Sequence, residues 1–368
     1  MKPQASIMAH AARNLGQIRL NSTVKTTSYD PRKQEIPEHS TLFSMIQPTG
    51  MFHLGNYLGA VRAWKDLTDY APDSTKLIFG TADLHAITIP KPAKDIRKFR
   101  SEAIASILAS GVNHERAIIY HQSALPEHAE LNWILSTLAG TGYLNRMTQW
   151  KSKSEGLDNS SLGLFAYPVL QAADILLFKS THVPVGDDQV QHLELCRTLA
   201  ESFNKQFGKT FKLPTTLLAP TKKILSLRDP LKKMSKSDKD QNATIYINET
   251  SDEIAKKIKK AVTDSTSTHF NYDPENRPGV SNLINIISGI QRKSIQEVES
   301  DISDFKDHKT FKDYVCYVIN EEINEPRRKF EELVQNSNYL NKIVQEGNEK
   351  ARAIASVNIK EFKQKVGF

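Results

Sequence analysis

Short apolar segments alternate with longer amphipathic segments between residues 41 and 207. Apolar residues recur at helical spacing in the longer segments, whereas the short ones have the length and character of buried strands. Strands that alternate with helices form a parallel sheet with helices on both faces. The sequence therefore predicts an α/β fold with a doubly wound parallel sheet. The expected strands are Thr41–Ile46, Lys76–Gly80, Ala117–His121 and His182–Val185, and the expected helices begin near Asn56 and span Ala93–Ser110, Pro126–Lys153, Tyr167–Phe178 and Asp188–Phe207.

Polar clusters follow three of the expected strands. They are Gln47–Asn56, Thr81–His85 and Gly186–Gln189. Open α/β sheets bind ligands beyond the carboxyl ends of their strands, so we expect these clusters to share one binding site.

The sequence pattern changes after about Ser251, where helical spacing of apolar residues replaces strand-like segments. We expect Ser251 to cap a basic helix, and a further helix to follow Pro278. Three more helices are expected over residues 309–320, 327–334 and 348–365. The predicted organisation is a leader over residues 1–37, an α/β domain over 38–240 and an all-helical domain over 241–368.

The N-terminal segment is basic. Residues 1–29 contain Lys2, Arg13, Arg19 and Lys25 and no acidic residue, so they supply four of the seven net positive charges. Apolar residues at helical spacing with Arg, Ser and Thr are typical of a transit peptide that directs a protein to the mitochondrial matrix. A disordered basic tail is the alternative.

Two cysteines, Cys196 and Cys316, lie far apart and form no C-x-x-C motif. A disulfide framework or structural zinc site is not expected, and we predict no metal site built from the protein alone. No apolar run is long enough to cross a bilayer, so we expect no membrane partner.

The segment Lys233-Met234-Ser235-Lys236-Ser237 places two ammonium groups and two hydroxyls close together. Such groups suit a polyphosphate, although no P-loop is present. In the Gln47–Asn56 segment, Gly50 and Gly55 allow the backbone to approach a ligand, and His53 can donate to a phosphate. Together the two segments predict an ATP site. A strand–turn–helix corner with a packed histidine is the alternative for the first segment alone.

These two segments resemble the signatures of class I aminoacyl-tRNA synthetases: Gln47-Pro48-Thr49-Gly50 with His53-Leu54-Gly55-Asn56 resembles the first, and K-M-S-K-S is the second. Three further segments resemble the tryptophanyl-tRNA synthetase family, namely Asn145–Ser154, Tyr167–Leu177 and Val183–His192. The similarity runs from about Thr41 to the C-terminus. It implies a Rossmann-like catalytic domain with a C-terminal helical domain that binds the tRNA anticodon, and a homodimer.

The resemblance also assigns residues. It implies catalytic roles for Lys233, Lys236, Lys153 and His53. The implied ATP contacts are Gln47, Gly55, Asn56, Gly186, Asp187, Asp188, Ile224, Lys233, Met234, Ser235, Lys236 and Ser237. The implied tryptophan pocket is Asp174, Phe43, His85, Tyr167, Gln171, Val183, Val185 and Gln189. The implied reaction forms tryptophanyl-adenylate from tryptophan and ATP, with Mg²⁺ on the pyrophosphate oxygens, and then charges tRNA(Trp).

Asp174 is the residue that we expect to select the amino acid. Apolar residues surround it in the sequence, and this pattern argues against a solvent-exposed carboxylate. The resemblance implies that it accepts the indole N–H, which phenylalanine lacks. A buried polar group left unpaired disfavours the wrong substrate by roughly 10⁴–10⁵-fold. Gln171, where bacterial members have Met, is a departure that retunes this pocket.

Three other readings stay open at this stage. A tyrosyl-tRNA synthetase shares the fold and both signatures, but the Ala172–Leu177 run fits tryptophan better. A nucleotidylyltransferase would use ATP without tRNA, and the helical region after Ser251 argues against it. A catalytically dead RNA-binding relative would have broken signatures, whereas both are intact.

Overall fold

A computed structural model describes residues 26–30, 32, 34–154, 160–218, 223–266 and 269–368. Most of the expected leader, residues 1–25, lies outside this range. Within the described range, no helix is both long and apolar enough to cross a bilayer.

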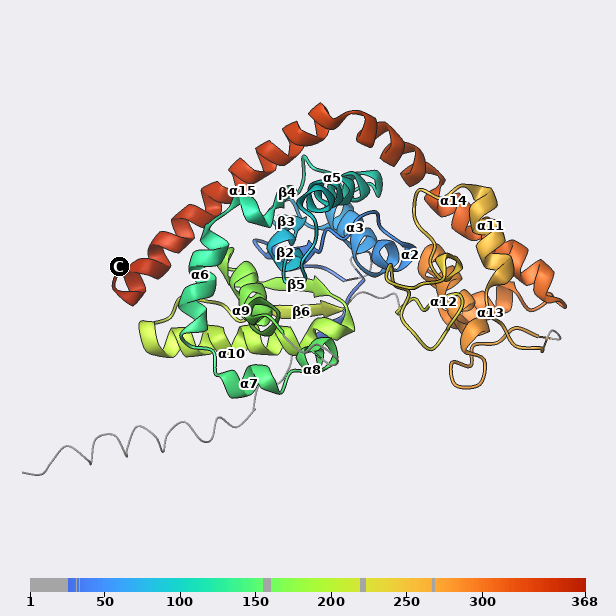
Figure 1. Cartoon of the computed structure of the whole chain (residues 1–368), viewed down its shortest axis with the longest axis horizontal. Coiled ribbons are helices and arrows are strands. Elements are labelled where there is room, and N and C mark those ends of the chain that lie inside the picture. Colours follow the sequence, from blue (N-terminus) through green and yellow to red (C-terminus); the bar gives the residue numbers. More distant parts are fainter. Residues whose placement is uncertain (1–25, 31, 33, 155–159, 219–222, 267–268) are drawn as a thin grey trace, which may run out of the picture.

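In the described part of the chain, six strands form one sheet, and each pair of neighbouring strands is parallel (Figure 1). The order across the sheet is β1-β6-β5-β2-β3-β4. The strands are β1 Thr26–Ser28, β2 Thr41–Ile46, β3 Lys76–Thr81, β4 Ile118–His121, β5 His182–Val185 and β6 Thr215–Leu218. The order reverses between β2 and β5, which is the switch point where such sheets bind ligands. The predicted doubly wound fold is confirmed.

Helices cover the sheet and then continue into a helical lobe, at the right of Figure 1. The helices that accompany the strands are α2 Leu54–Asn56, η1 Tyr57–Val61, α3 Arg62–Tyr70, α4 Asp83–Ala86, α5 Ala93–Ala109, η2 Gln122–Ala124, α6 Glu127–Ser136, α7 Thr141–Asn145, α8 Thr148–Ser154, α9 Leu162–Leu177, η3 Asp187–Gln189 and α10 Val190–Phe207. Those that follow are η4 Gln241–Ala243, α11 Ser251–Lys260, α12 Pro278–Gln291, α13 Ile295–Asp301, α14 His308–Gln335 and α15 Ser337–Val366.

The sheet core forms for the reason the pattern predicted. Leu42 and Phe43 of β2 and Ile78 and Phe79 of β3 are all buried, because strands covered on both faces have apolar side chains on both. In register, Phe43 lies beside Ile78. The central strands are thereby fixed at one depth, and their carboxyl ends meet at one edge.

Two sequence expectations in the helical region were wrong. Thr250, not Ser251, caps α11: its side chain accepts from the Glu253 N–H, and the Glu253 carboxylate accepts from the Thr250 N–H. Residues 309–320 and 327–334 belong to one helix, α14, which contains Pro326. Buried Ile323 and Phe330 lie on either side of that proline, so the apolar stripe continues through it.

The last helix returns to the sheet (Figure 1). α15 runs from the helical lobe across β4, and Gly347 contacts the β4 backbone so closely that a Cβ there would lie 1.8 Å from the Ile119 carbonyl oxygen. Beyond that point Ala355 and Phe362 join the core formed by α9 and α10. The helical region therefore contributes side chains to the hydrophobic core beside the sheet and also forms a lobe of its own. The domain boundary at residue 240 stays a prediction.

The strand β1 lies inside the segment that was expected to be a leader. Thr26–Ser28 pair with β6 in the register Thr26 to Thr216. The folded part therefore begins before residue 37, inside the segment that was predicted as a leader.

Candidate active site

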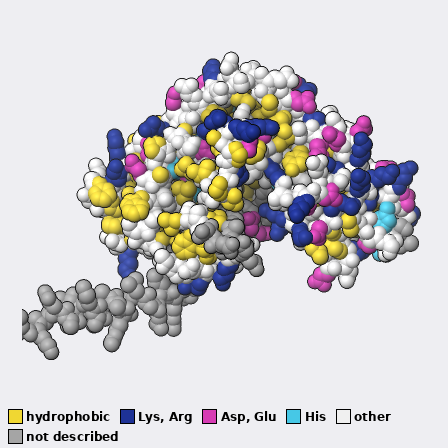
Figure 2. Space-filling model, in the orientation of Figure 1, with side chains coloured by type: hydrophobic (Ala, Val, Ile, Leu, Met, Phe, Trp, Pro, Cys, Tyr) yellow, Lys and Arg dark blue, Asp and Glu magenta, His cyan; other side chains and the backbone are white. Residues whose placement is uncertain are grey.

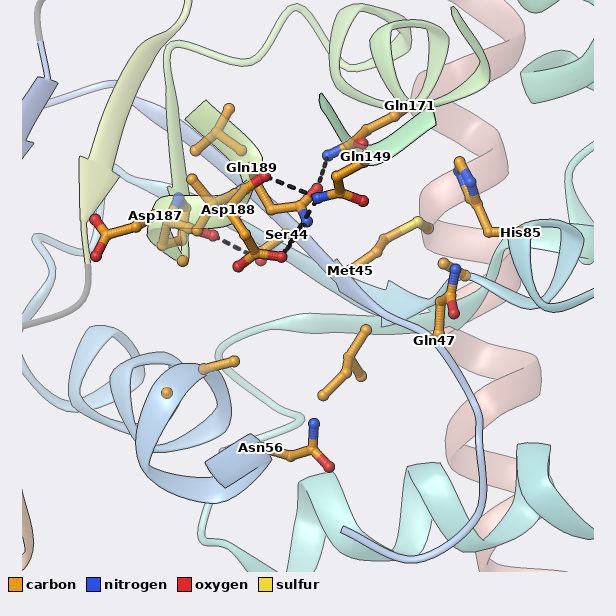
Figure 3. Close-up of a pocket in the computed structure, with 18 of the residues that line it drawn as sticks. Ser44, Met45, Gln47, Asn56, His85, Gln149, Gln171, Asp187, Asp188 and Gln189 are labelled. Carbon is orange, nitrogen blue, oxygen red and sulfur yellow. Dashed lines mark hydrogen bonds between the residues drawn. The ribbon is translucent and has the colours of Figure 1, made fainter. Parts of the chain in front are cut away.

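A cavity of about 710 Å³ opens at the carboxyl ends of β2 and β5, at the switch point of the sheet (Figure 3). All eight residues predicted for the tryptophan pocket line it. So do eight of those predicted for ATP: Gln47, Gly55, Asn56, Gly186, Asp187, Asp188, Ile224 and Lys233. The structure thus brings together both halves of the predicted site from distant parts of the chain.

Asp174, on α9, is the buried carboxylate of this cavity. Its Oδ2 lies 2.8 Å from Nε2 of His85, and its Oδ1 accepts from Nε2 of Gln122 at 2.8 Å. Nδ1 of His128 lies 2.7 Å from the same Oδ1. Burial alone would raise the pKa of Asp174, but His128 and His85 outweigh it and hold the pKa well below its usual range. The carboxylate is therefore charged and already supplied with donors.

The expectation that this carboxylate stays unpaired without an indole is wrong. The side chains that pair with it lie on three other elements: α4 carries His85, η2 carries Gln122, and α6 carries His128. His128 is itself fixed, because the Tyr120 hydroxyl lies 2.9 Å from its Nε2. With Nε2 accepting from that hydroxyl, Nδ1–H is the donor that faces the carboxylate.

A second polar chain lies on the same side of the cavity, and Figure 3 shows part of it. The Tyr167 hydroxyl donates to Gln149 Oε1 at 2.9 Å, and Gln149 Nε2 donates to the Asp188 carbonyl oxygen at 2.8 Å. Gln189 Nε2 donates to the Asp188 carboxylate at 2.8 Å, while Gln171 Nε2 donates to Gln189 Oε1 at 3.1 Å. This network of hydrogen-bonded side chains offers several oxygen acceptors to an ammonium group at the cavity wall.

The first signature segment forms the opposite wall, where Asn56 and Gln47 lie in Figure 3. His53 caps α2: its Nδ1 accepts from the Asn56 N–H at 3.2 Å. Burial and the charges of Lys236 and Lys233 lower the pKa of His53 to about 3, so the ring is neutral. His53 packs under Gly55, where an added Cβ would lie 3.0 Å from its ring, and it is not among the described cavity-lining residues.

The second signature segment contributes one lysine to the cavity. Lys233 lines it and its Nζ lies 3.8 Å from Asp188 Oδ1. Met234 is buried and anchors the loop, because its N–H donates to the Ile224 carbonyl oxygen. The Ser235 and Ser237 hydroxyls lie 2.9 Å apart and bond to each other.

Lys236 does not line the described cavity. Its Nζ donates to the Gly50 carbonyl oxygen at 3.0 Å and lies 5.7 Å from the centre of the Phe52 ring. Burial lowers the pKa of Lys236 to about 8, although Glu102 opposes this. The lysine thus links the two signature segments directly.

Lys153, which was predicted to be catalytic, lies in α8, but its side chain is outside the described residues. Of the described residues, no group of three or more His, Cys, Asp and Glu is arranged to hold a metal ion.

Sequence reasoning missed several residues of the site. Gln149 lies in a segment that the resemblance quoted, so its presence in the cavity was within reach. Gln122 and His128 had no such signal, since neither lies in a motif and both act through Asp174. Ser44, Met45 and Lys223 also line the cavity without having been predicted.

Comparison with known proteins decides the family. The family described as tRNA synthetases class I (W and Y) matches residues 35–321. The chain belongs to this family. The membership predicted from the motifs is confirmed.

Several relatives are similar over most of their length. The mitochondrial tryptophan–tRNA ligase of Saccharomyces cerevisiae is 56% identical over 363 residues, which cover 94% of this chain and 96% of that protein. Tryptophan–tRNA ligase 2 of Streptomyces avermitilis is 44% identical over 331 residues, with 89% and 96% covered.

Solved structures agree with this similarity. The tryptophanyl-tRNA synthetase of Mycoplasma pneumoniae matches with a TM-score of 0.79 at 31% identity, covering 89% of this chain and 98% of that one. The enzyme of Campylobacter jejuni, complexed with ADP and tryptophan, matches with a TM-score of 0.73 at 31% identity, covering 89% and 100%.

Proposed function

We propose that this synthetase is a tryptophan–tRNA ligase, which activates L-tryptophan with ATP and transfers it to tRNA(Trp). The observation that carries this proposal is the buried, charged Asp174 in a cavity whose other walls come from the two signature segments. An indole has one N–H donor, and the carboxylate is an acceptor fixed in place to meet it. The mitochondrial and bacterial relatives named above carry the same activity in their names.

In the first step, the tryptophan carboxylate attacks the α-phosphorus of ATP in line. A bond forms between a carboxylate oxygen and phosphorus as the bond to the pyrophosphate oxygen breaks, giving tryptophanyl-adenylate and pyrophosphate. No protein nucleophile is required, so positioning and neutralisation of charge supply the rate. Lys233 faces the cavity for this task, and Lys236 reaches it by leaving the Gly50 carbonyl oxygen.

Mg²⁺ belongs to this step as part of the substrate. We infer that the phosphate oxygens of ATP hold it. Of the described residues that line the cavity, three have carboxylates: Asp174 is already paired with its own donors, and Lys233 pairs with Asp188, which leaves Asp187. Its chemistry there is to neutralise charge on the leaving pyrophosphate. Every other contribution to this step is made by the chain.

In the second step, the 2′-hydroxyl of the terminal adenosine of tRNA attacks the adenylate carbonyl carbon, and AMP leaves. The helical lobe is where we place the anticodon. Figure 2 shows lysine and arginine side chains on the visible face of that lobe. Lys256, Lys259 and Lys260 of α11 are exposed there, and phosphate contacts of this kind supply affinity without reading sequence.

A homodimer and the mitochondrial matrix complete the proposal. Three large apolar side chains, Ile87, Ile89 and Leu162, are exposed, and they adjoin because Ser161 Oγ donates to the Thr88 carbonyl oxygen at 3.5 Å. Exposed apolar residues that gather in this way mark association surfaces. The matrix location rests on the basic, acid-free segment before Asp30 and on the mitochondrial relative.

Amino-acid-dependent ATP–pyrophosphate exchange tests the function. We expect exchange with tryptophan, and neither tyrosine nor phenylalanine supporting a comparable rate. Exchange with tyrosine would transfer the assignment to the sister activity. If ATP bound but no amino acid supported exchange, the ligase proposal would be wrong.

A further inference from the structure

A second cavity, of about 310 Å³, lies at the carboxyl end of β4 between α5 and α15. It shares no described lining residue with the active-site cavity. Arg97 and Arg100 of α5 form one wall, Asn341 and Asn348 of α15 form another, and His121 lies at the strand end.

The charge of this cavity is positive. No acidic residue is among the described residues that line it. Arg97 has no hydrogen-bond or ion-pair partner in the described part of the chain, and it is exposed. Arg100 pairs with Asp83 behind the wall, with 2.8 Å between its Nε and Asp83 Oδ2.

The Asp83 carboxylate does not compete for a ligand, because its oxygens are engaged elsewhere. Oδ1 accepts from the Ser123 N–H at 2.8 Å and Oδ2 accepts from the Ser123 hydroxyl at 2.6 Å. Asp83 is itself buried. It therefore holds the Arg100 side chain in position and leaves its two terminal nitrogens as donors.

His121 adds a buried donor. It is 9% exposed, and its Nδ1 lies 2.5 Å from the Thr81 hydroxyl. Burial and the charge of Arg100 lower the pKa of His121 to about 4, so the ring is neutral and Nε2 carries the remaining proton when Nδ1 accepts from Thr81. Asn348 Oδ1 accepts from the backbone N–H of His121 at 3.1 Å. This contact directs the side-chain amide nitrogen of Asn348 away from the His121 backbone.

We propose that this second cavity binds a phosphate group, with Arg97 and Arg100 supplying charge and His121 and Asn348 supplying hydrogen bonds. Guanidinium groups match the geometry of phosphate oxygens and keep their charge at all working pH values. This phosphate comes from one of two sources. One is the backbone of tRNA, the substrate of the proposed function, on which this part of the inference rests. The other is free inorganic phosphate from solution, which does not take part in the proposed reaction.

The variant that tests the site is Arg97→Gln, made in the full chain. Arg97 is exposed and unpaired among the described residues, so its loss does not disturb the fold. Lys94→Gln is the matched control: Lys94 is exposed on the same helix, three residues earlier, and does not line the cavity. Each variant removes one positive charge from α5.

Three measurements separate the sources. Aminoacylation kinetics at several salt concentrations report on tRNA. Binding of inorganic phosphate, followed by ³¹P NMR at constant ionic strength, reports on the free ion. Tryptophan-dependent ATP–pyrophosphate exchange reports on the first step of the proposed function.

If tRNA supplies the phosphate, Arg97→Gln raises the KM for tRNA by about 3–10-fold and reduces the salt slope of log(kcat/KM) by about one, whereas Lys94→Gln does neither. If the free ion is the ligand, Arg97→Gln alone weakens phosphate binding and leaves the tRNA kinetics unchanged. Equal behaviour of Arg97→Gln and wild type in both assays would overturn the site. Wild-type protein without exchange activity would contradict the proposed function instead, and the NMR measurement would still decide the phosphate site.

Discussion

His85 Nε2 lies 2.8 Å from Asp174 Oδ2, a contact that joins α4 to the last turn of α9. On the other carboxylate oxygen, Gln122 and His128 approach from η2 and α6. The carboxylate that we propose as the indole acceptor is thus held from three sides. Because its charge and direction are set in advance, an arriving N–H meets an acceptor that needs no reorganisation.

Asp174→Asn should lower kcat/KM for tryptophan in ATP–pyrophosphate exchange by about 10–100-fold. A hydrogen bond to a charged group contributes about 1.5–3 kcal/mol, and about 1.4 kcal/mol corresponds to tenfold. The KM for ATP should change little, and circular dichroism should show the wild-type fold. An unchanged kcat/KM for tryptophan would remove Asp174 from the indole site.

The same geometry limits how strongly wild type rejects phenylalanine. The carboxylate keeps its contacts with His85, Gln122 and His128 when phenylalanine occupies the pocket, so it is never left fully unpaired. We expect the ratio of kcat/KM for tryptophan over phenylalanine to fall below the roughly 10⁴–10⁵ of a site with an unpaired group. Exchange kinetics with both amino acids give the ratio directly, and a ratio of about 10⁴ or more would contradict this interpretation.

His53 should make the protein less stable as the pH falls below 6.5. Its pKa is lowered from 6.5 to about 3, so between these values the unfolded chain binds a proton that the folded chain does not. Stability therefore rises with pH across this window, by up to about 1.4 kcal/mol per pH unit for one such group.

His53→Asn isolates this contribution, because Asn retains the capping of α2 but does not titrate. In urea unfolding from pH 7 to pH 4, the variant should lose less free energy of unfolding than wild type. Half-buried His114 supplies the control substitution, His114→Asn. Parallel curves for His53→Asn and wild type would show that His53 is protonated in the folded chain.

The sequence predicted the centre of the sheet well and its edge poorly. β2 and β5 have the expected bounds because they are apolar runs next to polar turns, where local pattern and burial agree. β6, Thr215–Leu218, has only four residues and follows Pro214, and β1 lies in a basic stretch that resembles a leader. β1 lies at the edge of the sheet and β6 lies beside it, and such short strands are fixed by their partners, which a local pattern does not contain.

The sequence likewise predicted one part of the candidate site and missed another. Motifs identified many of the residues that line the cavity, since a ligand constrains their chemistry and spacing. The partners of Asp174 come from separate segments, and their contacts depend on how α6 packs on α9. Nothing in the spacing of Lys236 and Gly50, 186 residues apart, indicates that the two residues are hydrogen-bonded.

The apolar patch predicts the oligomeric state. Ile87 is 59% exposed, Ile89 55% and Leu162 77%. An aspartate at such a surface is costly to bury, so Leu162→Asp and Ile89→Asp should convert a dimer to a monomer in light scattering. Leu231→Asp changes an equally exposed leucine next to the second signature loop and should leave the mass unchanged. A monomeric wild type would contradict the patch as a dimer surface.

Lys236 predicts a pH dependence of the first step. Its pKa is lowered to about 8, so the ammonium that is needed for the leaving pyrophosphate is lost as the pH rises through this value. In free enzyme, kcat/KM for ATP should therefore be constant below pH 7 and fall toward tenfold per pH unit above pH 8.

Two substitutions make this assignment specific. Lys236→Ala should lower the rate of adenylate formation by about 10²–10³-fold in stopped-flow measurements, which is the usual effect of removing one charge-stabilising donor. Lys236→Arg keeps a charge at every working pH, so its rate should be lower than wild type but should not decline above pH 8. If the decline persisted in Lys236→Arg, the titrating group would be a different one, and the link between Lys236 and the Gly50 carbonyl oxygen would serve only to hold the loop.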